Sequence, residues 1–97
     1  MKLDPILASI RAIVRKHVPD PSYKVFLFGS RPAGFARKFS DYDIGILGDQ
    51  PVRATKLGDI KEELEESNIP YVVDVVDFFR VDDSFKELAM QHTQALI

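Results

Sequence analysis

Apolar residues recur at helical spacing in three parts of the chain. Asp4 has the character of an N-cap and Pro5 of a first helical residue, and a one-sided apolar pattern follows them. Residues 53–66 form a second amphipathic pattern, with lysines and glutamates opposite the apolar face. A capping box, a serine followed three residues later by a glutamate, opens residues 84–96. We therefore expect three main helices.

Compact apolar runs lie between these helical patterns. Residues 23–28, 42–47 and 71–76 are short, rich in β-branched or aromatic side chains, and bounded by turn residues. Each is expected to be a strand. Residues 30–40 form a basic connection with room for a turn or two of helix. The alternation predicts an α/β (α+β) fold, a small mixed sheet of at least three strands flanked by helices.

Composition narrows the function classes. A chain of 97 residues favours a single domain over residues 1–97. The net charge of −2 argues against a free-standing nucleic-acid binder, which usually carries a basic stripe. The absence of cysteine excludes disulfides, thiolate zinc sites and cysteine nucleophiles, and fits a cytoplasmic protein. The N-terminal pattern predicts a helix rather than a signal peptide, and no apolar run reaches the length of a membrane span.

Three aspartates interrupt segments that are otherwise apolar. Asp41 and Asp43 stand at the start of the second predicted strand, and Asp74 lies in the middle of the third. A charged side chain inside a buried strand is unfavourable unless it is paired or binds a metal. These three positions are therefore the first candidates for chemistry.

The spacing of the aspartates suits a pair of magnesium ions. Asp41 and Asp43 are two residues apart, so on a strand they project from one face with Cβ atoms about 6.6 Å apart. If the second and third strands are neighbours, Asp74 joins them from the adjacent strand. Two Mg²⁺ ions about 3.5–4 Å apart fit between such carboxylates and relieve their mutual repulsion.

Each aspartate also has a structural explanation. Asp41 alone is typical of a turn, because Asp favours turns. Asp74 can instead form a buried ion pair with an arginine. Asp43 is harder to explain in this way, since apolar residues follow it directly. Asp77 stands at the end of the third predicted strand, near a turn, and is interpreted as structural.

A second candidate element follows the first predicted strand directly. Gly29 lets the backbone approach a phosphate closely. The Ser30 hydroxyl and the next backbone N–H groups can donate to phosphate oxygens, and Arg31 can bind a phosphate in bidentate fashion. A strand that ends in Gly-Ser is also a common turn, so the value of this element lies in the aspartates that follow it.

The stretch FGSRPAGFARKFSDYDIGI, residues 28–46, resembles the signature of the DNA polymerase β-like nucleotidyltransferase superfamily. That signature is a Gly-Ser, a spacer, and then Asp-x-Asp followed by apolar residues. Arg31, Gly34 and Ser40 also match the minimal nucleotidyltransferase (MNT) subgroup. Asp74 stands in an apolar strand downstream, as the third carboxylate of that subgroup does. The resemblance covers nearly the whole chain.

The resemblance implies a role for each candidate residue. Asp41 and Asp43 bind two Mg²⁺ ions, and Asp74 binds the catalytic ion and helps to deprotonate the attacking hydroxyl. Gly29 and Ser30, with Arg31, hold the β- and γ-phosphates of an NTP. The implied reaction transfers an NMP, AMP from ATP in the typical case, to a hydroxyl of a protein or RNA and releases pyrophosphate.

The resemblance also implies a partner protein. MNT proteins are typically encoded beside a small helical HEPN-family protein and act as its antitoxin, and AMP transfer onto a tyrosine of the HEPN toxin is one known mechanism. Larger members of the superfamily add domains that recognise the base or hold the acceptor. We expect this chain to have room for neither, so that base selectivity and acceptor choice come from a partner or are poor.

A second hypothesis is a non-catalytic binding module of the same fold, which neutralises a helical partner by covering its active site. The intact Gly29-Ser30 pair and the three aspartates count against this hypothesis, because a pure binder has no need of carboxylates that repel one another. Binding of Mg-ATP separates the two hypotheses.

Other features have simpler interpretations. His17 and His92 fall on apolar faces of predicted helices and are interpreted as residues at the edge of the core. The charged run 61–66 is interpreted as a solvated helix face with local charge pairs. Phe78 and Phe79 are adjacent, so both cannot face one core, and one of them is expected at the surface.

Several residues of the connection after the first strand also carry predictions. Phe35 and Phe39 are expected to pack this segment onto the core rather than to stack on a base. Many members of the MNT subgroup have a second basic residue where this chain has Ala33. Either Arg37 and Lys38 replace it, or the phosphates are bound more weakly.

Overall fold

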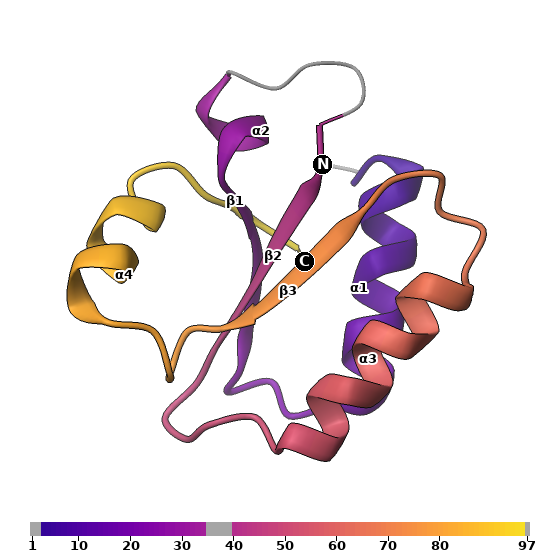
Figure 1. Ribbon diagram of the computed structural model, residues 1–97, viewed down its shortest axis with the longest axis horizontal. Coiled ribbons are helices and arrows are strands. Elements are labelled where there is room, and N and C mark those ends of the chain that lie inside the picture. The colour runs from indigo at the N-terminus through magenta and orange to yellow at the C-terminus, as the bar shows by residue number, and fades with distance from the viewer. Residues whose placement is uncertain (1–2, 35–39, 97) are drawn as a thin grey trace.

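A four-stranded mixed sheet organises the structure, a computed structural model that describes residues 3–34 and 40–96 (Figure 1). The strands lie in the order β3-β2-β1-β4, with β2 and β3 parallel and β1 antiparallel to both of its neighbours. Along the chain the elements are α1 (Pro5–His17), β1 (Lys24–Phe28), α2 (Ser30–Ala33), β2 (Tyr42–Leu47), α3 (Ala54–Glu66), β3 (Val73–Asp77), α4 (Asp83–Ala89) and β4 (Gln94–Ala95). The expected small mixed sheet flanked by helices is confirmed.

Helices α1 and α3 cover one face of the sheet and form the larger core. Asp4 caps α1 as expected, because its Oδ1 accepts a hydrogen bond of 2.9 Å from the Leu7 amide. His17 and Lys16 both contact Glu63 of α3, so polar contacts at the edge of the core also join the two helices. The core between helices and sheet includes Leu7, Ile10, Val14, Val25, Leu27, Ile44, Ile46, Ile60, Leu64 and Val75.

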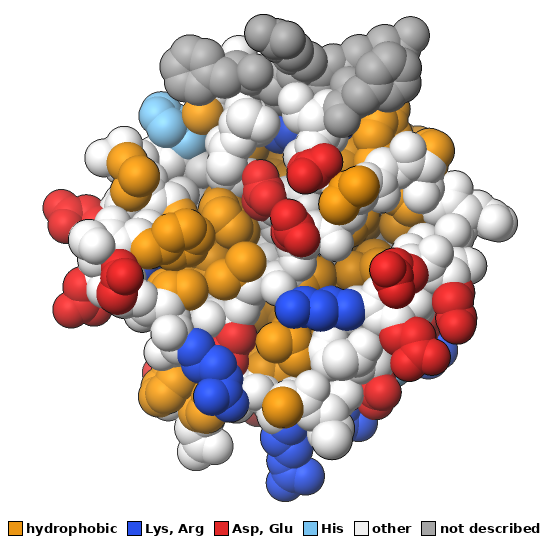
Figure 2. Space-filling model, viewed as in Figure 1, with side chains coloured by type: hydrophobic (Ala, Val, Ile, Leu, Met, Phe, Trp, Pro, Cys, Tyr) orange, Lys and Arg blue, Asp and Glu red, His pale blue; other side chains and the backbone are white. Residues whose placement is uncertain are grey.

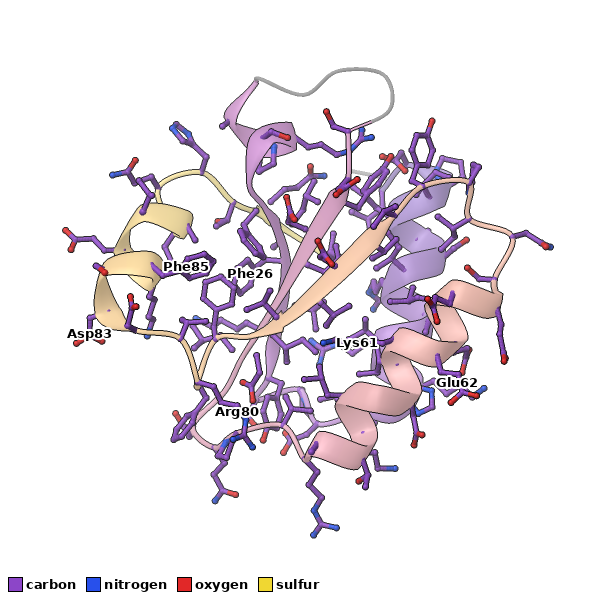
Figure 3. All side chains as sticks on the ribbon, viewed as in Figure 1. Phe26, Lys61, Glu62, Arg80, Asp83 and Phe85 are labelled. Carbon is purple, nitrogen blue, oxygen red and sulfur yellow. The ribbon has the colours of Figure 1, made fainter. Side chains whose placement is uncertain are left out.

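The opposite face of the sheet carries a separate aromatic cluster. Phe26 and Phe28 alternate with the core residues of β1, so they point to this second face. Phe78 packs against both rings in edge-to-face contacts with centroids 5.0 Å apart. Figure 3 shows Phe85 pointing from α4 toward Phe26, and the Phe85 ring lies 6.1 Å from that of Phe28. Helix α4 is thus held on this face by aromatic contacts.

The chain after Ala89 differs from the prediction. The last predicted helix ends there, and β4 pairs with β1 instead. The Leu96 amide donates to the Val25 carbonyl at 2.9 Å and the Leu96 side chain is buried. Pairing with β1 satisfies backbone groups at the edge of that strand and buries Leu96. The spacing of apolar residues along the sequence does not reveal that this edge is available for pairing. His92 consequently lies outside the helix and is exposed, so its placement at the edge of the core was wrong.

The expected capping box of α4 is also wrong. The N-cap is Asp82, whose Oδ1 accepts a hydrogen bond of 2.7 Å from the Phe85 amide. Ser84 lies inside the first turn and its hydroxyl donates to Asp82. A carboxylate accepts this amide hydrogen bond more strongly than a hydroxyl, because the acceptor is charged.

Three other expectations are confirmed. Phe78 is 2% exposed and Phe79 is 50% exposed, so only one of the pair faces the core. His17 is a partly buried residue at the edge of the core. Asp77 is buried and structural: its carboxylate accepts from the amides of Val52 and Phe79 and from the Arg80 guanidinium. In the part of the chain that the structure describes, no helix has the length and apolarity to cross a membrane.

Gly45 tests the packing of the aromatic cluster on the sheet. A Cβ atom at Gly45 would overlap the rings of Phe26 and Phe78. We expect Gly45→Ala to lower the free energy of unfolding by about 1–3 kcal/mol, because a well-packed site must shift to admit a methyl group. Gly58→Ala is the matched control: this glycine lies in α3 with open space around it, so the change should stabilise by about 0.5–1 kcal/mol. Urea denaturation of the variants measures both, and equal effects would contradict the packing argument.

Candidate active site

The parallel pairing of β2 and β3 brings the predicted carboxylates together. Asp43 stands directly opposite Asp74 in the register of the two strands. Asp41 comes just before β2, two residues from Asp43. The condition that the second and third strands be neighbours is therefore confirmed. Figure 2 shows a group of acidic side chains in the middle of this face, next to an apolar area over α4.

Electrostatic repulsion is concentrated at the central carboxylate of this group. Burial raises the pKa of Asp43 above its ordinary value of 3.8, and the negative charges of Asp74 and Asp41 raise it further. Asp43 is partly buried, whereas Asp41 and Asp74 are exposed. The protein thus holds one carboxylate in a position where its ionised form is disfavoured by its surroundings.

The alternative interpretation of Asp74 as a buried ion pair is wrong. Asp74 is exposed, and within residues 3–34 and 40–96 no salt bridge involves it. The apolar sequence around Asp74 suggested burial on both faces of the strand. Instead Val73 and Val75 point toward α3 and the larger core, while the face that Asp74 shares with Asp43 is open at this end.

Gly29 joins the carboxylates to the predicted phosphate loop. It follows β1 directly, has a φ of 82°, and is the N-cap of α2. A Cβ atom at Gly29 would overlap the carboxylate of Asp43, the residue that faces Phe28 across β1 and β2. Only glycine combines this backbone conformation with this contact. The first backbone N–H groups of α2, beginning at Ser30, therefore start beside the acidic group.

Arg31 lies in a place that the sequence did not reveal. Its guanidinium carbon stands 3.8 Å from the centroid of the Tyr42 ring and 5.3 Å from that of Tyr71. Its Nη2 donates to the Ser40 carbonyl at 2.5 Å and its Nε to the Asp41 carbonyl at 3.3 Å. In this position Arg31 holds the backbone that leads into β2. Binding of a phosphate by Arg31 stays a prediction.

Sequence reasoning missed Tyr42 and Tyr71 as supports of this site. Their rings meet edge to face with centroids 5.3 Å apart, and Tyr42 is buried. Both sit on segments predicted as strands, but the contact joins positions far apart in the sequence. Phe35, Phe39, Arg37 and Lys38, for which packing or phosphate roles were expected, lie outside the described residues.

The three aspartates fit hard metal ions as a chemical set rather than as a closed cage. Among the residues with described positions, no three side chains of His, Cys, Asp or Glu are arranged to hold one ion. Asp43 nevertheless feels the charges of both Asp41 and Asp74. Carboxylate oxygens are the ligands that Mg²⁺ prefers, and it usually keeps several waters or phosphate oxygens in addition. A group of carboxylates open to solvent leaves room for those additional ligands.

Comparison with known proteins places this geometry in a family. The family described as "Polymerase beta, Nucleotidyltransferase" matches residues 9–97. The chain is 37% identical over 82 residues to the probable protein adenylyltransferase MntA of Haemophilus influenzae, covering 84% of this chain and 70% of that protein.

Solved structures share the fold. A toxin–antitoxin crystal structure with AMP-PNP has a TM-score of 0.74 at 21% identity, covering 98% of this chain and 73% of that chain. A complex of the tri-AMPylated Shewanella oneidensis HEPN toxin with its MNT antitoxin has a TM-score of 0.69 at 18% identity, covering 95% and 69%. At these identities the structures support the fold, and the sequence matches support the family. The chain therefore belongs to the polymerase β nucleotidyltransferase family and has the activity class of that family, nucleotidyl transfer.

Proposed function

We propose that this protein transfers AMP from ATP to a hydroxyl group of a protein and thereby acts as the antitoxin of a small helical HEPN-type partner. The observation that carries the proposal is Asp43, held opposite Asp74 and directly against Gly29. The similarity to a probable protein adenylyltransferase supports AMP as the transferred group and protein as the acceptor. The fold shared with an MNT antitoxin bound to an AMPylated HEPN toxin supports the kind of partner. ATP as donor also suits a cytoplasmic location.

The site residues divide between donor and acceptor. Gly29 and the N–H groups and hydroxyl at Ser30 hold the β- and γ-phosphates, since the loop lies beside the carboxylates and begins a helix. Asp41, Asp43 and Asp74 would hold two Mg²⁺ ions. When bound, these ions neutralise the triphosphate charge and polarise its α-phosphorus. Arg31 keeps Asp41 and the start of β2, which carries Asp43, in place through its contacts with Tyr42 and the preceding carbonyls.

The reaction is a substitution at the α-phosphorus of ATP. The acceptor hydroxyl oxygen forms a bond to this phosphorus, and the bond to the oxygen that bridges the α- and β-phosphorus breaks. Pyrophosphate leaves with that oxygen. Asp74, which is exposed on the open face, accepts the hydroxyl proton and passes it to solvent. The protein contributes by orienting the donor and placing an acceptor next to Asp74.

Replacing a central carboxylate should abolish transfer. We expect Asp43→Asn and Asp74→Asn each to lower the rate of AMP transfer by on the order of 10²-fold or more, because each removes a carboxylate that would hold Mg²⁺ beside the transferred group. Incubation with Mg-ATP and a HEPN-type partner, followed by mass spectrometry for an AMP adduct on that partner, measures the rate. Asp59→Asn, an exposed aspartate of α3, is the control and should keep the full rate. An unchanged rate in Asp43→Asn would sink the assignment, and tight partner binding without any adduct would favour the non-catalytic module.

The raised pKa of Asp43 predicts a stability effect of opposite sign to the activity effect. In the metal-free protein, a raised pKa in the folded state means that stability falls as pH rises from the ordinary value of 3.8 through the folded pKa. Asp43→Asn removes this penalty, so we expect the variant to melt at a higher temperature than the parent protein at neutral pH. The two melting temperatures should converge at and below pH 3.8.

Magnesium should reverse this order. Mg²⁺ binds the folded parent protein and raises its melting temperature by mass action, while Asp43→Asn should respond little. Differential scanning calorimetry from acid to neutral pH, with and without MgCl₂, measures both effects. A variant that is less stable than the parent at neutral pH without metal would contradict the repulsion at Asp43.

A further inference from the structure

The outer edge of β3 is open next to the candidate active site. In the sheet order β3-β2-β1-β4, β3 is an end strand, and within the described residues only β2 pairs with it. Proteins usually protect such edges, because unpaired backbone groups invite a further strand. Here the edge belongs to the strand that carries Asp74.

Two hydrogen bonds show which residues of β3 face outward. The Tyr42 amide donates to the Val72 carbonyl at 2.9 Å, and the Phe78 amide donates to the Ile46 carbonyl at 2.9 Å. In a parallel pair, alternate residues turn both of their backbone groups toward the partner strand. Residues 72, 74, 76 and 78 therefore face β2 with their backbone. The N–H and C=O groups of Val73 and Val75 are directed to the open side.

A groove of about 670 Å³ runs along this open side. One wall is α3, with Lys61, Leu64 and Glu65, and the other is the segment from Ile69 to Val75, which includes Asp74. In Figure 3 the Lys61 side chain reaches from α3 toward the strands, and among the described residues it forms no salt bridge. Because Asp74 lines it, the groove is continuous with the candidate active site.

We propose that the acceptor polypeptide docks in an extended conformation on the outer edge of β3, as an added strand. This inference rests on the proposed function and names how its acceptor is held. The N–H and C=O groups of Val73 and Val75 pair with the backbone of the acceptor, which supplies affinity without requiring a particular sequence. The strand that positions Asp74 then also positions the substrate.

The geometry of an added strand explains how a hydroxyl reaches the site. Side chains of neighbouring strands in register share the same alternation of faces. A residue opposite Asp74 projects onto the open face, where its hydroxyl meets the carboxylates. The residues on either side of it project toward α3, where Leu64 offers apolar contact and Lys61 offers a cation to an acidic side chain.

The charges of the groove favour a polypeptide over RNA. Asp74 and Glu65 contribute two negative charges along the groove and Lys61 one positive charge. A chain of phosphates would be repelled by this balance and has no regular N–H and C=O groups to pair with the edge. An extended peptide carries both groups at the spacing of a strand.

Backbone modification of the acceptor tests the docking directly. The probe is a synthetic peptide library of about nine residues, a length that spans a typical strand, with a fixed central Tyr, Ser or Thr. Peptides labelled with AMP from Mg-ATP are identified by mass spectrometry, and the best one is resynthesised with a single N-methyl group at each position in turn. We expect about tenfold losses of kcat/KM at alternate positions and little change between them, because only alternate N–H groups face β3.

A pair of variants tests the same contact from the protein side. Val73→Pro removes an N–H on the open edge, which proline tolerates at edge strands, and should lower transfer to the peptide about tenfold, mainly through KM. Val73→Ala trims the same side chain but keeps the N–H, so it should stay close to the parent protein. Calorimetry with Mg-ATP should give the parent affinity for both variants, which shows that the donor site is intact.

The outcomes separate this inference from the proposed function. A flat N-methyl profile, or Val73→Pro as active on peptides as Val73→Ala, overturns the docking on β3. An AMP adduct on a HEPN-type partner or on RNA, with no labelled peptide, overturns the docking but leaves nucleotidyl transfer in place. No adduct on any acceptor overturns both.

Discussion

The pairing of β2 with β3 is the interaction on which the rest of the site depends. It sets Asp43 opposite Asp74 in register, and no local sequence feature could do this, because the two residues are brought together only by the sheet. Burial of Asp43, together with the like charges of Asp74 and Asp41, disfavours its ionised form, as the raised pKa of Asp43 records. The large core under α1 and α3 and the aromatic cluster on the other face must supply the stability that offsets this cost.

The second constraint is the close approach of Gly29 to Asp43. Because the first strand of the chain is the central antiparallel neighbour of β2, the turn after β1 comes to the same end of the sheet as the carboxylates. The predicted phosphate loop at Gly29 and Ser30 and the carboxylate of Asp43 are thus linked through one pair of strands, β1 and β2. Arg31 adds a second link across the same end through Tyr42. The site is assembled by few elements, all within the region that carries the Gly-Ser and Asp-x-Asp motif, except for β3.

The sequence allowed much of this to be predicted, and the failures have identifiable causes. Strand β2 was predicted with its observed bounds, because turn residues frame a continuous apolar run. The exposure of Asp74 was not predictable, because an apolar strand does not say which of its faces a helix covers. The prediction of a helix after Ala89 was wrong, because a helix and a short strand can both bury the Leu96 side chain and the apolar pattern does not distinguish them. The contact of Arg31 with two tyrosines depends on tertiary structure alone.

Asp77 has a consequence for how substitutions in this protein are interpreted. Asp77 lies three residues beyond Asp74, at the end of β3. Its carboxylate accepts hydrogen bonds from the Val52 amide, just before α3, and from the Arg80 guanidinium. Together with the register against β2 and the buried side chains of Val75 and Phe78, Asp77 helps to hold β3 in place. Loss of Asp77 would displace Asp74 without touching any substrate. In an alanine scan it would look like a fourth catalytic aspartate, although its part is mechanical.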